Sequence, residues 1–186
     1  MRTGKDAAYP QGALTDCDIA CGYMGGLLAT HAWTPQEWEA QTARWRLPIF
    51  VPNTALPARQ QAKACIQALR DLGVPPGNAY SLDLEAAIAP DWVRLFADTT
   101  HAAGWRCMVY GSPGTLFANP PRTGYWVANP TGSPHMYEHP LVRGTQYAWQ
   151  TDWDLSLFDD NLALWEAGTG SRAKSATTAK STHGGQ

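Results

Sequence analysis

Short apolar stretches alternate along the chain with stretches in which apolar residues recur at helical spacing. The strand-like stretches are residues 19–24, 47–51, 80–85, 105–110, 125–128 and 145–149. Helical spacing links Ala62, Cys65, Ile66, Leu69 and Leu72 in one stretch, and Val93, Phe96, Ala97 and Thr100 in another. Gly73 and Gly104 follow these two stretches and predict where the helices end. The pattern therefore predicts strands that alternate with helices.

An additional helix has a clear start signal. Thr34 stands at the position of a helix N-cap, Pro35 at the first helical position and Glu37 at the third. This is the pattern of a capping box, in which the threonine and glutamate side chains each accept a hydrogen bond from the other residue's backbone. The sequence therefore predicts a helix that begins at Pro35.

Alternating strands and helices predict a parallel sheet covered by helices, either an open doubly wound sheet or a closed barrel. A nucleotide-binding sheet would carry a glycine-rich phosphate loop, but the first strand is followed only by Gly25-Gly26. The strands after Tyr110 are short and end in aromatic residues, which favours a barrel. A full (β/α)₈ barrel needs about 200 residues or more. We therefore expect an α/β fold, a small or incomplete TIM-like (β/α) barrel with a parallel sheet core and some crossover helices short or missing.

The composition changes sharply near the end of the chain. Residues 168–186 are mostly Gly, Ser, Thr, Ala and Lys and include no large apolar residue, so packing cannot offset the entropy of ordering them. We expect one domain over residues 1–167 and a disordered tail over residues 168–186. The tail carries three basic residues and no acid. It is either a plain linker or a loose tether to an anionic polymer such as a cell wall.

Charge and hydropathy exclude two kinds of partner. The formal net charge is −2, and the body of the chain has no Arg/Lys cluster, which gives no electrostatic basis for binding nucleic acid. No stretch approaches the roughly 20 apolar residues of a membrane span, and the N-terminus lacks the apolar segment of a secretory signal. We expect no nucleic acid, no membrane insertion and no signal peptide in this chain.

The four cysteines, Cys17, Cys21, Cys65 and Cys107, could form two disulfides. Their apolar surroundings favour buried thiols instead. Cys17 and Cys21 lack a second Cys/His pair at zinc-site spacing, and the five histidines form no paired metal motif. We expect neither a metal nor a cofactor.

Two carboxylates stand close together at the end of the third predicted strand. Side chains two residues apart in a strand face the same way, so Asp83 and Glu85 are expected to share one face. Barrels of this kind place their chemistry at that strand end, and apolar neighbours raise a carboxyl pKa enough for general-acid work. The same pair could instead cap the next helix or bind an arginine, and the spacing alone does not choose.

Four short motifs follow one another along residues 4–158. They are Gly4-Lys-Asp6 followed by Gln11-Gly12, then Asp83-Leu-Glu85, Gln146-Tyr147, and Asp154-Leu-Ser-Leu-Phe158. In this order they resemble the motifs of the family 25 glycoside hydrolases, the lysozyme-type muramidases, and of related hydrolase-like barrels in actinobacterial and phage proteins. The chain departs from that pattern at Ala7-Ala8, where the family has a hydroxyl-bearing residue, and at Ser156, where Asn is typical.

The resemblance implies cleavage of the β-1,4 link after N-acetylmuramic acid in peptidoglycan or a related glycan. Glu85 would protonate the leaving oxygen, and Asp83 would orient the acetamido oxygen for internal attack or position a water. Asp6 and Asp154 would line the same pocket. The resemblance also implies a monomer that acts at the cell wall and otherwise stays cytoplasmic until released.

Two other classes of function remain alternatives. The departure at Ala7-Ala8 is consistent with a barrel of the same descent that binds a glycan or serves a structural role without turnover. An amidase or esterase is the second alternative, but the chain has no Gly-x-Ser-x-Gly motif, and neither Ser112 nor Cys107 has an evident base nearby in the sequence.

Aromatic residues near strand ends are candidates for sugar contacts, because sugar faces stack on flat apolar surfaces. The expected substrate-binding residues are Tyr23, Tyr80, Tyr110, Trp126, Gln146, Tyr147 and Trp149. Each aromatic among them could equally belong to the core, where large aromatic side chains dominate packing.

Overall fold

The computed structural model describes residues 1–9, 12–27, 32–86, 88–118 and 124–168. Gln11 of the first motif and residues 169–186 of the expected tail lie outside this range. The elements are β1 (Arg2–Ala7), β2 (Ile19–Gly26), α1 (Pro35–Glu39), β3 (Trp45–Val51), α2 (Ala58–Asp71), β4 (Ala79–Asp83), α3 (Pro90–Ala102), β5 (Arg106–Gly111), α4 (Pro113–Leu116), β6 (Gly124–Ala128), β7 (Val142–Trp149), β8 (Asp154–Phe158) and β9 (Trp165–Glu166).

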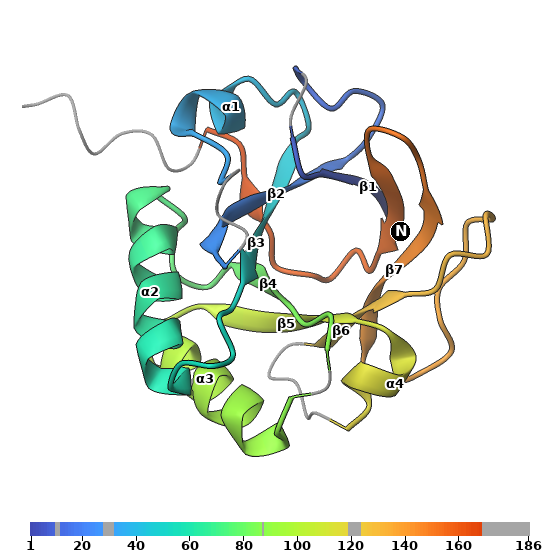
Figure 1. Cartoon of the computed structure of the whole chain (residues 1–186). Helices are drawn as coiled ribbons and strands as arrows, with labels where there is room; N and C mark the ends of the chain where they lie inside the picture. Colours follow the sequence, from blue (N-terminus) through green and yellow to red (C-terminus); the bar gives the residue numbers. More distant parts are fainter. Residues whose placement is uncertain (10–11, 28–31, 87, 119–123, 169–186) are drawn as a thin grey trace, which may run out of the picture.

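Strands β1 to β8 close into a barrel (Figure 1). Neighbours from β1 to β7 are parallel, whereas β8 is antiparallel to both β7 and β1. The expectation of a parallel sheet is therefore wrong for β8, which is antiparallel to both of its neighbours. Only residues 150–153 join β7 to β8, and a parallel connection needs a crossover of a dozen or more residues. The fold is a closed, mixed barrel of eight strands.

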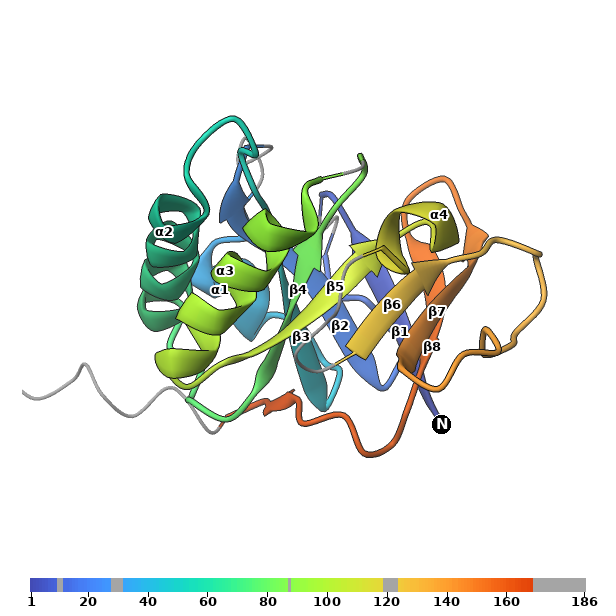
Figure 2. The same cartoon turned by 90° about the horizontal axis from the view of Figure 1, so that it is seen from below.

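Helices cover only part of this barrel. The two long helices, α2 and α3, pack against each other on the outside of the strands (Figures 1 and 2). The other two, α1 and α4, are only five and four residues long. Described residues form no helix between β6 and β7 or between β7 and β8. Short or missing crossover helices were expected from the length of the chain, and the strands dominate the fold. None of the described helices is both long and apolar enough to cross a membrane.

Strand alternation separates two apolar layers. Leu47, Met108 and Trp126 belong to the layer inside the barrel, while Leu69 and Phe96 belong to the layer between strands and helices. The inner layer includes the ring of Phe158, which is approached by the backbone of β1 and β7. A Cβ at Gly4 or Gly144 would collide with this ring, so both positions require glycine.

The segment after β8 closes the end of the barrel at which the parallel strands begin (Figure 2). Its residues Leu162 and Leu164 belong to the inner apolar layer, and the N–H of Ala79 donates a hydrogen bond to the carbonyl of Ala163. The segment then forms β9, which pairs antiparallel with the start of β3. This segment does not cover the other end of the barrel, where the parallel strands finish, so a functional site can form there.

The capping box at Thr34 is present as predicted. The Glu37 N–H donates to the Thr34 hydroxyl at 3.2 Å, and the Thr34 N–H donates to the Glu37 carboxylate at 2.6 Å. The two long helices also end just before Gly73 and Gly104, as the sequence predicted. These glycines have φ of 77° and 104°, the left-handed conformation that is common just after a helix. All four cysteines are free thiols, with Cys17 half-buried and the other three buried.

We expect Thr34→Ala to lower the free energy of unfolding by about 1 kcal/mol, because the Thr34 hydroxyl no longer accepts a hydrogen bond from the Glu37 N–H or donates one to the Glu37 carboxylate. Chemical denaturation measures this change. Thr99→Ala is the matched control, since Thr99 lies half-buried within α3, where its hydroxyl donates to the Leu95 carbonyl and contributes no cap. A Thr34 variant as stable as the Thr99 variant would contradict the role of the box.

Candidate active site

The open end of the barrel gathers polar side chains that point inward. They come from five parallel strands and from β8, each near the end at this mouth. We call them the mouth cluster: Asp6 (β1), Tyr23 (β2), Asp83 (β4), Tyr110 (β5), Gln146 (β7) and Asp154 (β8). Parallel strands bring equivalent ends to one edge, and alternation turns every second side chain inward. The cluster therefore follows directly from closure of the barrel.

Hydrogen bonds fix one side of the cluster. The Tyr110 hydroxyl donates to Gln146 Oε1 at 2.5 Å, and Gln146 Nε2 donates to Asp154 Oδ2 at 2.7 Å. The backbone N–H of Gln150 also donates to Asp154 Oδ1 at 3.3 Å. Burial raises the pKa of Asp154, and these two donors oppose the rise because they favour the carboxylate. Asp154 is thus an oriented acceptor at the mouth.

Asp6 and Asp83 differ from Asp154 because each has a buried oxygen without a hydrogen-bond partner in the described residues. Their exposed fractions are 8% and 3%. Burial raises the pKa of Asp6 well above its ordinary value, and the charges of Asp154 and Asp83 add to the rise. Burial also raises the pKa of Asp83 to about 7, with a further contribution from the charge of Glu85. Both side chains therefore retain a proton at a pH where exposed carboxyls are ionised.

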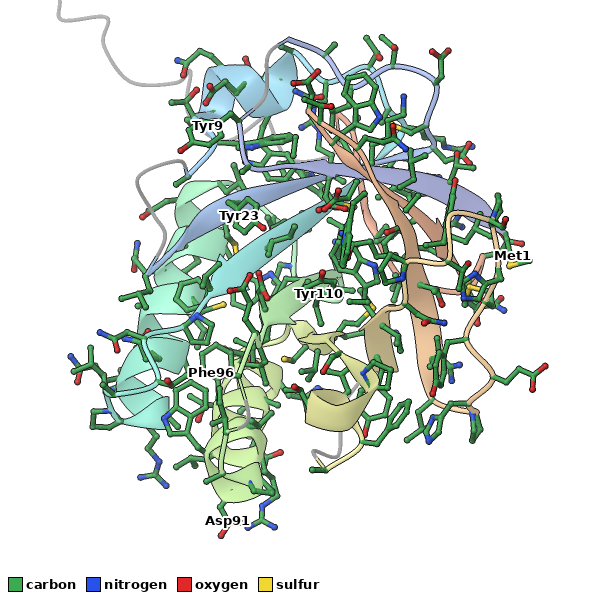
Figure 3. All side chains as sticks on the ribbon, turned by 45° about the vertical axis from the view of Figure 1, so that its right-hand side comes forward. Met1, Tyr9, Tyr23, Asp91, Phe96 and Tyr110 are labelled. Atoms are coloured by element: carbon green, nitrogen blue, oxygen red, sulfur yellow. The ribbon has the colours of Figure 1, made fainter. Side chains whose placement is uncertain are left out.

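Two tyrosines complete the inner surface of the cluster. Tyr23 and Tyr110 lie on β2 and β5, against the apolar layer inside the barrel, whereas Phe96 belongs to the outer layer (Figure 3). Burial raises the pKa of both hydroxyls, and the charges of Asp6 and Asp83 add to the effect. Both tyrosines therefore stay protonated and can act as hydrogen-bond donors. The ring of Tyr110 packs edge-on against Trp126, at 4.8 Å between ring centres.

A pocket of about 360 Å³ opens beside the cluster. It is lined by Asp6, Ala7, Ala8, Tyr9, Tyr23, Gln150, Thr151, Asp152, Trp153 and Asp154. A second hollow of about 220 Å³ shares Tyr9 and Trp153 with it and extends to Lys5. The Lys5 ammonium lies 4.9 Å from the centre of the Trp153 ring. The two hollows together form a cleft with an aromatic rim.

Tyr9 and Trp153 were not among the residues expected to contact substrate. Their exposed fractions are 56% and 39%, and both lie in loops that follow strands ending at the mouth. The available signal was an aromatic residue just beyond a strand end next to an expected acid. Trp153 immediately precedes Asp154, and Tyr9 follows Asp6 by three residues.

Glu85 has a different environment from the one expected. Strand β4 ends at Asp83, so the predicted strand over residues 80–85 is two residues too long. The shared face of Asp83 and Glu85 therefore no longer follows from alternation, and Glu85 is exposed whereas Asp83 is buried. The charge of Glu85 still acts on Asp83 and Tyr23. Glu85 thus lies at the rim of the mouth cluster.

Two of the expected sugar contacts belong to the core. Tyr80 points outward from β4 into the layer under the helices, where its hydroxyl is 2.8 Å from the hydroxyl of Thr100. Trp126 lies inside the barrel and donates a hydrogen bond to the Ser156 hydroxyl at 3.1 Å. Neither side chain is exposed. Both expectations are corrected because proximity to a strand end does not determine which side chains reach solvent.

The remaining expected contacts lie on β7. Gln146 is part of the mouth cluster, and Tyr147 is buried at a β-bulge where it has no partner in the strand register. Trp149 pairs in register with Asp154 and is 65% exposed. Trp149 is thus the expected aromatic on β7 that a ligand can reach.

A larger hollow, of about 700 Å³, lies away from these acids. Its lining includes Trp33, Phe50 and Ala68, between α2 and the ends of β2 and β3, and among the described residues of the lining Asp71 is the one acid. The chemistry is therefore concentrated in the smaller pocket at the mouth. Over the described residues, no three or more His, Cys, Asp or Glu side chains are grouped so that they could hold a metal ion.

The fold and the site together define this protein as a closed barrel with a cluster of acidic side chains at its open end. No protein-family model matches the chain, and no curated protein gives a significant sequence match. An uncharacterized protein of B. stearothermophilus has a similar structure, with a TM-score of 0.68 and 18% identity, covering 88% of this chain and 99% of that one. The Tat-secreted protein Rv2525c of Mycobacterium tuberculosis, solved with L-tartrate, gives a TM-score of 0.64 and 13% identity over 88% and 98%.

The modular autolysin LytC of Streptococcus pneumoniae is similar over part of its length. It matches with a TM-score of 0.59 and 18% identity, covering 85% of this chain and 46% of LytC. A second structure of LytC contains a synthetic peptidoglycan ligand. At these sequence identities the similarity shows a shared fold only.

Proposed function

We propose that this barrel is a glycoside hydrolase that cleaves peptidoglycan glycan strands in the manner of an N-acetylmuramidase. The observation that carries the proposal is the convergence of Asp6, Asp83 and Asp154 at one mouth, with Glu85 at its rim. These are the four acids of the motifs that resemble the family 25 hydrolases. The fold shared with an autolysin that has been solved with a peptidoglycan ligand supports the same substrate class.

The proposed roles follow from exposure and hydrogen bonding. Glycoside hydrolysis needs one carboxylic acid that protonates the leaving oxygen and a second group that stabilises or attacks the anomeric carbon. Glu85 is the proton donor in this proposal, because it is the exposed acid at the rim and can touch a bound chain. Asp83 orients the acetamido group of the substrate, whose polar atoms would satisfy its unpartnered oxygen. Asp154, held by Gln146, supplies an oriented acceptor.

Incubation with purified peptidoglycan tests the proposal. We expect new reducing ends at N-acetylmuramic acid, measured by a reducing-sugar assay and by mass spectrometry of the released fragments. New amino groups without reducing ends would indicate an amidase instead. The hydrolase proposal is abandoned if no wall preparation is cleaved.

A glycan-binding module without turnover is the second candidate. It is favoured by the nearly complete burial of Asp6 and Asp83, which leaves little of either carboxyl accessible in the structure without a ligand. Binding of wall glycan without release of reducing ends would support this candidate.

Both candidates require the aromatic rim to contact the glycan. We expect Trp153→Ala to weaken glycan binding by about 2- to 10-fold, the contribution typical of one aromatic contact. Calorimetry with soluble wall fragments measures the affinity. Leu95→Ala is the matched control, because Leu95 is a similarly exposed apolar residue on α3. Equal affinities for the two variants would mean that the glycan does not bind at this cleft.

A further inference from the structure

A further hollow, separate from those described above, lies at the opposite end of the barrel from the mouth. It measures about 80 Å³ and is lined by Pro35, Trp38, Glu39, Arg46, Leu72, Trp165 and Gly168. Arg46 stands near the start of β3 and pairs in register with Trp165 of β9. The hollow is therefore separated from the mouth cluster by the length of the barrel.

Three buried N–H groups in this lining have no hydrogen-bond acceptor among the described residues. They are Arg46 Nε, Trp38 Nε1 and Trp165 Nε1. Arg46 is only 7% exposed, and both tryptophans are buried. The three side chains are contiguous, since the guanidinium lies 4.8 Å from the centre of the Trp165 ring and the two indole rings are 5.9 Å apart. One small space is thus bordered by three side chains with unused donors.

The unpartnered groups are all donors, and one of them carries a positive charge. A buried donor without an acceptor is unfavourable, and a buried charge without a counter-charge is more so. Burial accordingly lowers the pKa of Arg46, although the charge of Glu39 opposes this effect. Glu39 is exposed and forms no ion pair with Arg46 in the structure. A group that reaches these nitrogens from the hollow must therefore accept hydrogen bonds and be negative, and the side chains must turn to meet it, because the nitrogens themselves have almost no accessible surface.

A carboxylate has these properties and the right size. It is acceptor-only, it offers about four lone-pair positions, and its planar shape matches the fork of donors on arginine. A water also brings two donors, for which this set of three N–H groups has no acceptor. A volume of about 80 Å³ exceeds the roughly 30 Å³ of one water and leaves room for a carboxylate with a short carbon stem.

We propose that the hollow beneath α1 binds the carboxylate group of a small organic acid, held by Arg46, Trp38 and Trp165. The site is independent of the reaction proposed at the mouth. It joins α1, β3 and β9, three elements that the occupied site would hold together.

The test uses the full chain labelled with ¹⁵N, titrated with sodium acetate at pH 7 and constant ionic strength. The indole N–H signals of Trp38 and Trp165 are assigned by Trp38→Phe and Trp165→Phe. We expect both signals to move downfield with a single saturable dependence on acetate. Acetamide, which is neutral and nearly the same shape, should leave them in place.

Two arginine variants distinguish binding at a specific site from a nonspecific effect of positive charge. Arg46→Met should weaken acetate binding by about 10- to 100-fold, the range for a hydrogen bond to a charged group. Arg44→Met is the matched control and should bind as the wild type does, because Arg44 is an exposed neighbour that pairs with Glu166. If Arg46→Met does not fold, Trp38→Phe retains the aromatic ring and should weaken binding by about 2- to 10-fold.

Several outcomes overturn the inference. No saturable shift in the wild type would mean that the three donors bind only water. Equal shifts with acetamide, or equal losses in Arg44→Met and Arg46→Met, would exclude a specific carboxylate site. Acetate binding that is found only in Glu39→Gln would mean that Glu39 itself fills the hollow in solution.

Discussion

Glu85→Gln is expected to lower the rate of peptidoglycan cleavage by about 10²- to 10⁴-fold, the usual effect of removing a general acid. The amide has nearly the same shape and keeps its hydrogen-bonding capacity, but it cannot give up a proton to the glycosidic oxygen. Because Glu85 is exposed at the rim, the fold and the affinity for glycan should be unchanged. Release of reducing ends at saturating substrate measures the rate, and calorimetry measures the affinity.

The matched control is Glu138→Gln, which removes the charge of another exposed glutamate, on the loop between β6 and β7. This variant should cleave at the wild-type rate. Asp83→Asn should also impair turnover, through loss of orientation. If Glu85→Gln cleaves at an undiminished rate, Glu85 is not the acid, and the proton donor must be sought among Asp6, Asp83 and Asp154.

Asp83→Asn is expected to raise the free energy of unfolding above pH 7, by up to about 4 kcal/mol. The pKa of Asp83 is about 7 in the folded protein and about 4 in an unfolded chain. Between these values the folded state holds one more proton, so the contribution of Asp83 to stability falls as the pH rises. It is fully present below about pH 4 and lost above about pH 7, where the buried carboxyl must ionise. Asparagine remains neutral throughout.

Urea denaturation at pH 5 and pH 8 measures this effect. The stability gained by Asp83→Asn should be larger at pH 8 than at pH 5. Asp152→Asn is the control, because Asp152 lines the same pocket but is exposed, and should change stability by less than about 0.5 kcal/mol. Identical pH dependence in wild type and Asp83→Asn would show that Asp83 is not buried in the way the structure describes. A stabilised variant with impaired turnover would show that this buried acid is retained for function rather than for folding.

Much of the fold could be predicted from local patterns. Strands β2 to β7, the two long helices and the capping box follow from spacings within a few residues, because backbone periodicity and capping act at short range. The direction of β8 did not follow in the same way. Alternating elements predicted parallel neighbours, whereas the four residues between β7 and β8 impose an antiparallel turn.

The acids of the mouth were all identified from the sequence, but their different environments were not. Spacing predicted that Asp83 and Glu85 would share one face of a strand, whereas β4 ends at Asp83, which is buried, and Glu85 beyond it is exposed. For the aromatic residues too, the sequence did not predict which side chains are buried and which are accessible. Tyr80 and Trp126 face the two apolar layers, while Tyr9 and Trp153 form the accessible rim.

The sequence by itself determined the alternation of strands and helices, the start of α1 and the acids that could perform chemistry. The tertiary structure alone decided which of these acids meet. Asp6, Asp83 and Asp154 are far apart in the chain and come together only because the barrel closes between β1 and β8. Closure also decides burial, and burial sets the pKa values, because desolvation depends on every element packed around a carboxyl and not on its neighbours in the sequence.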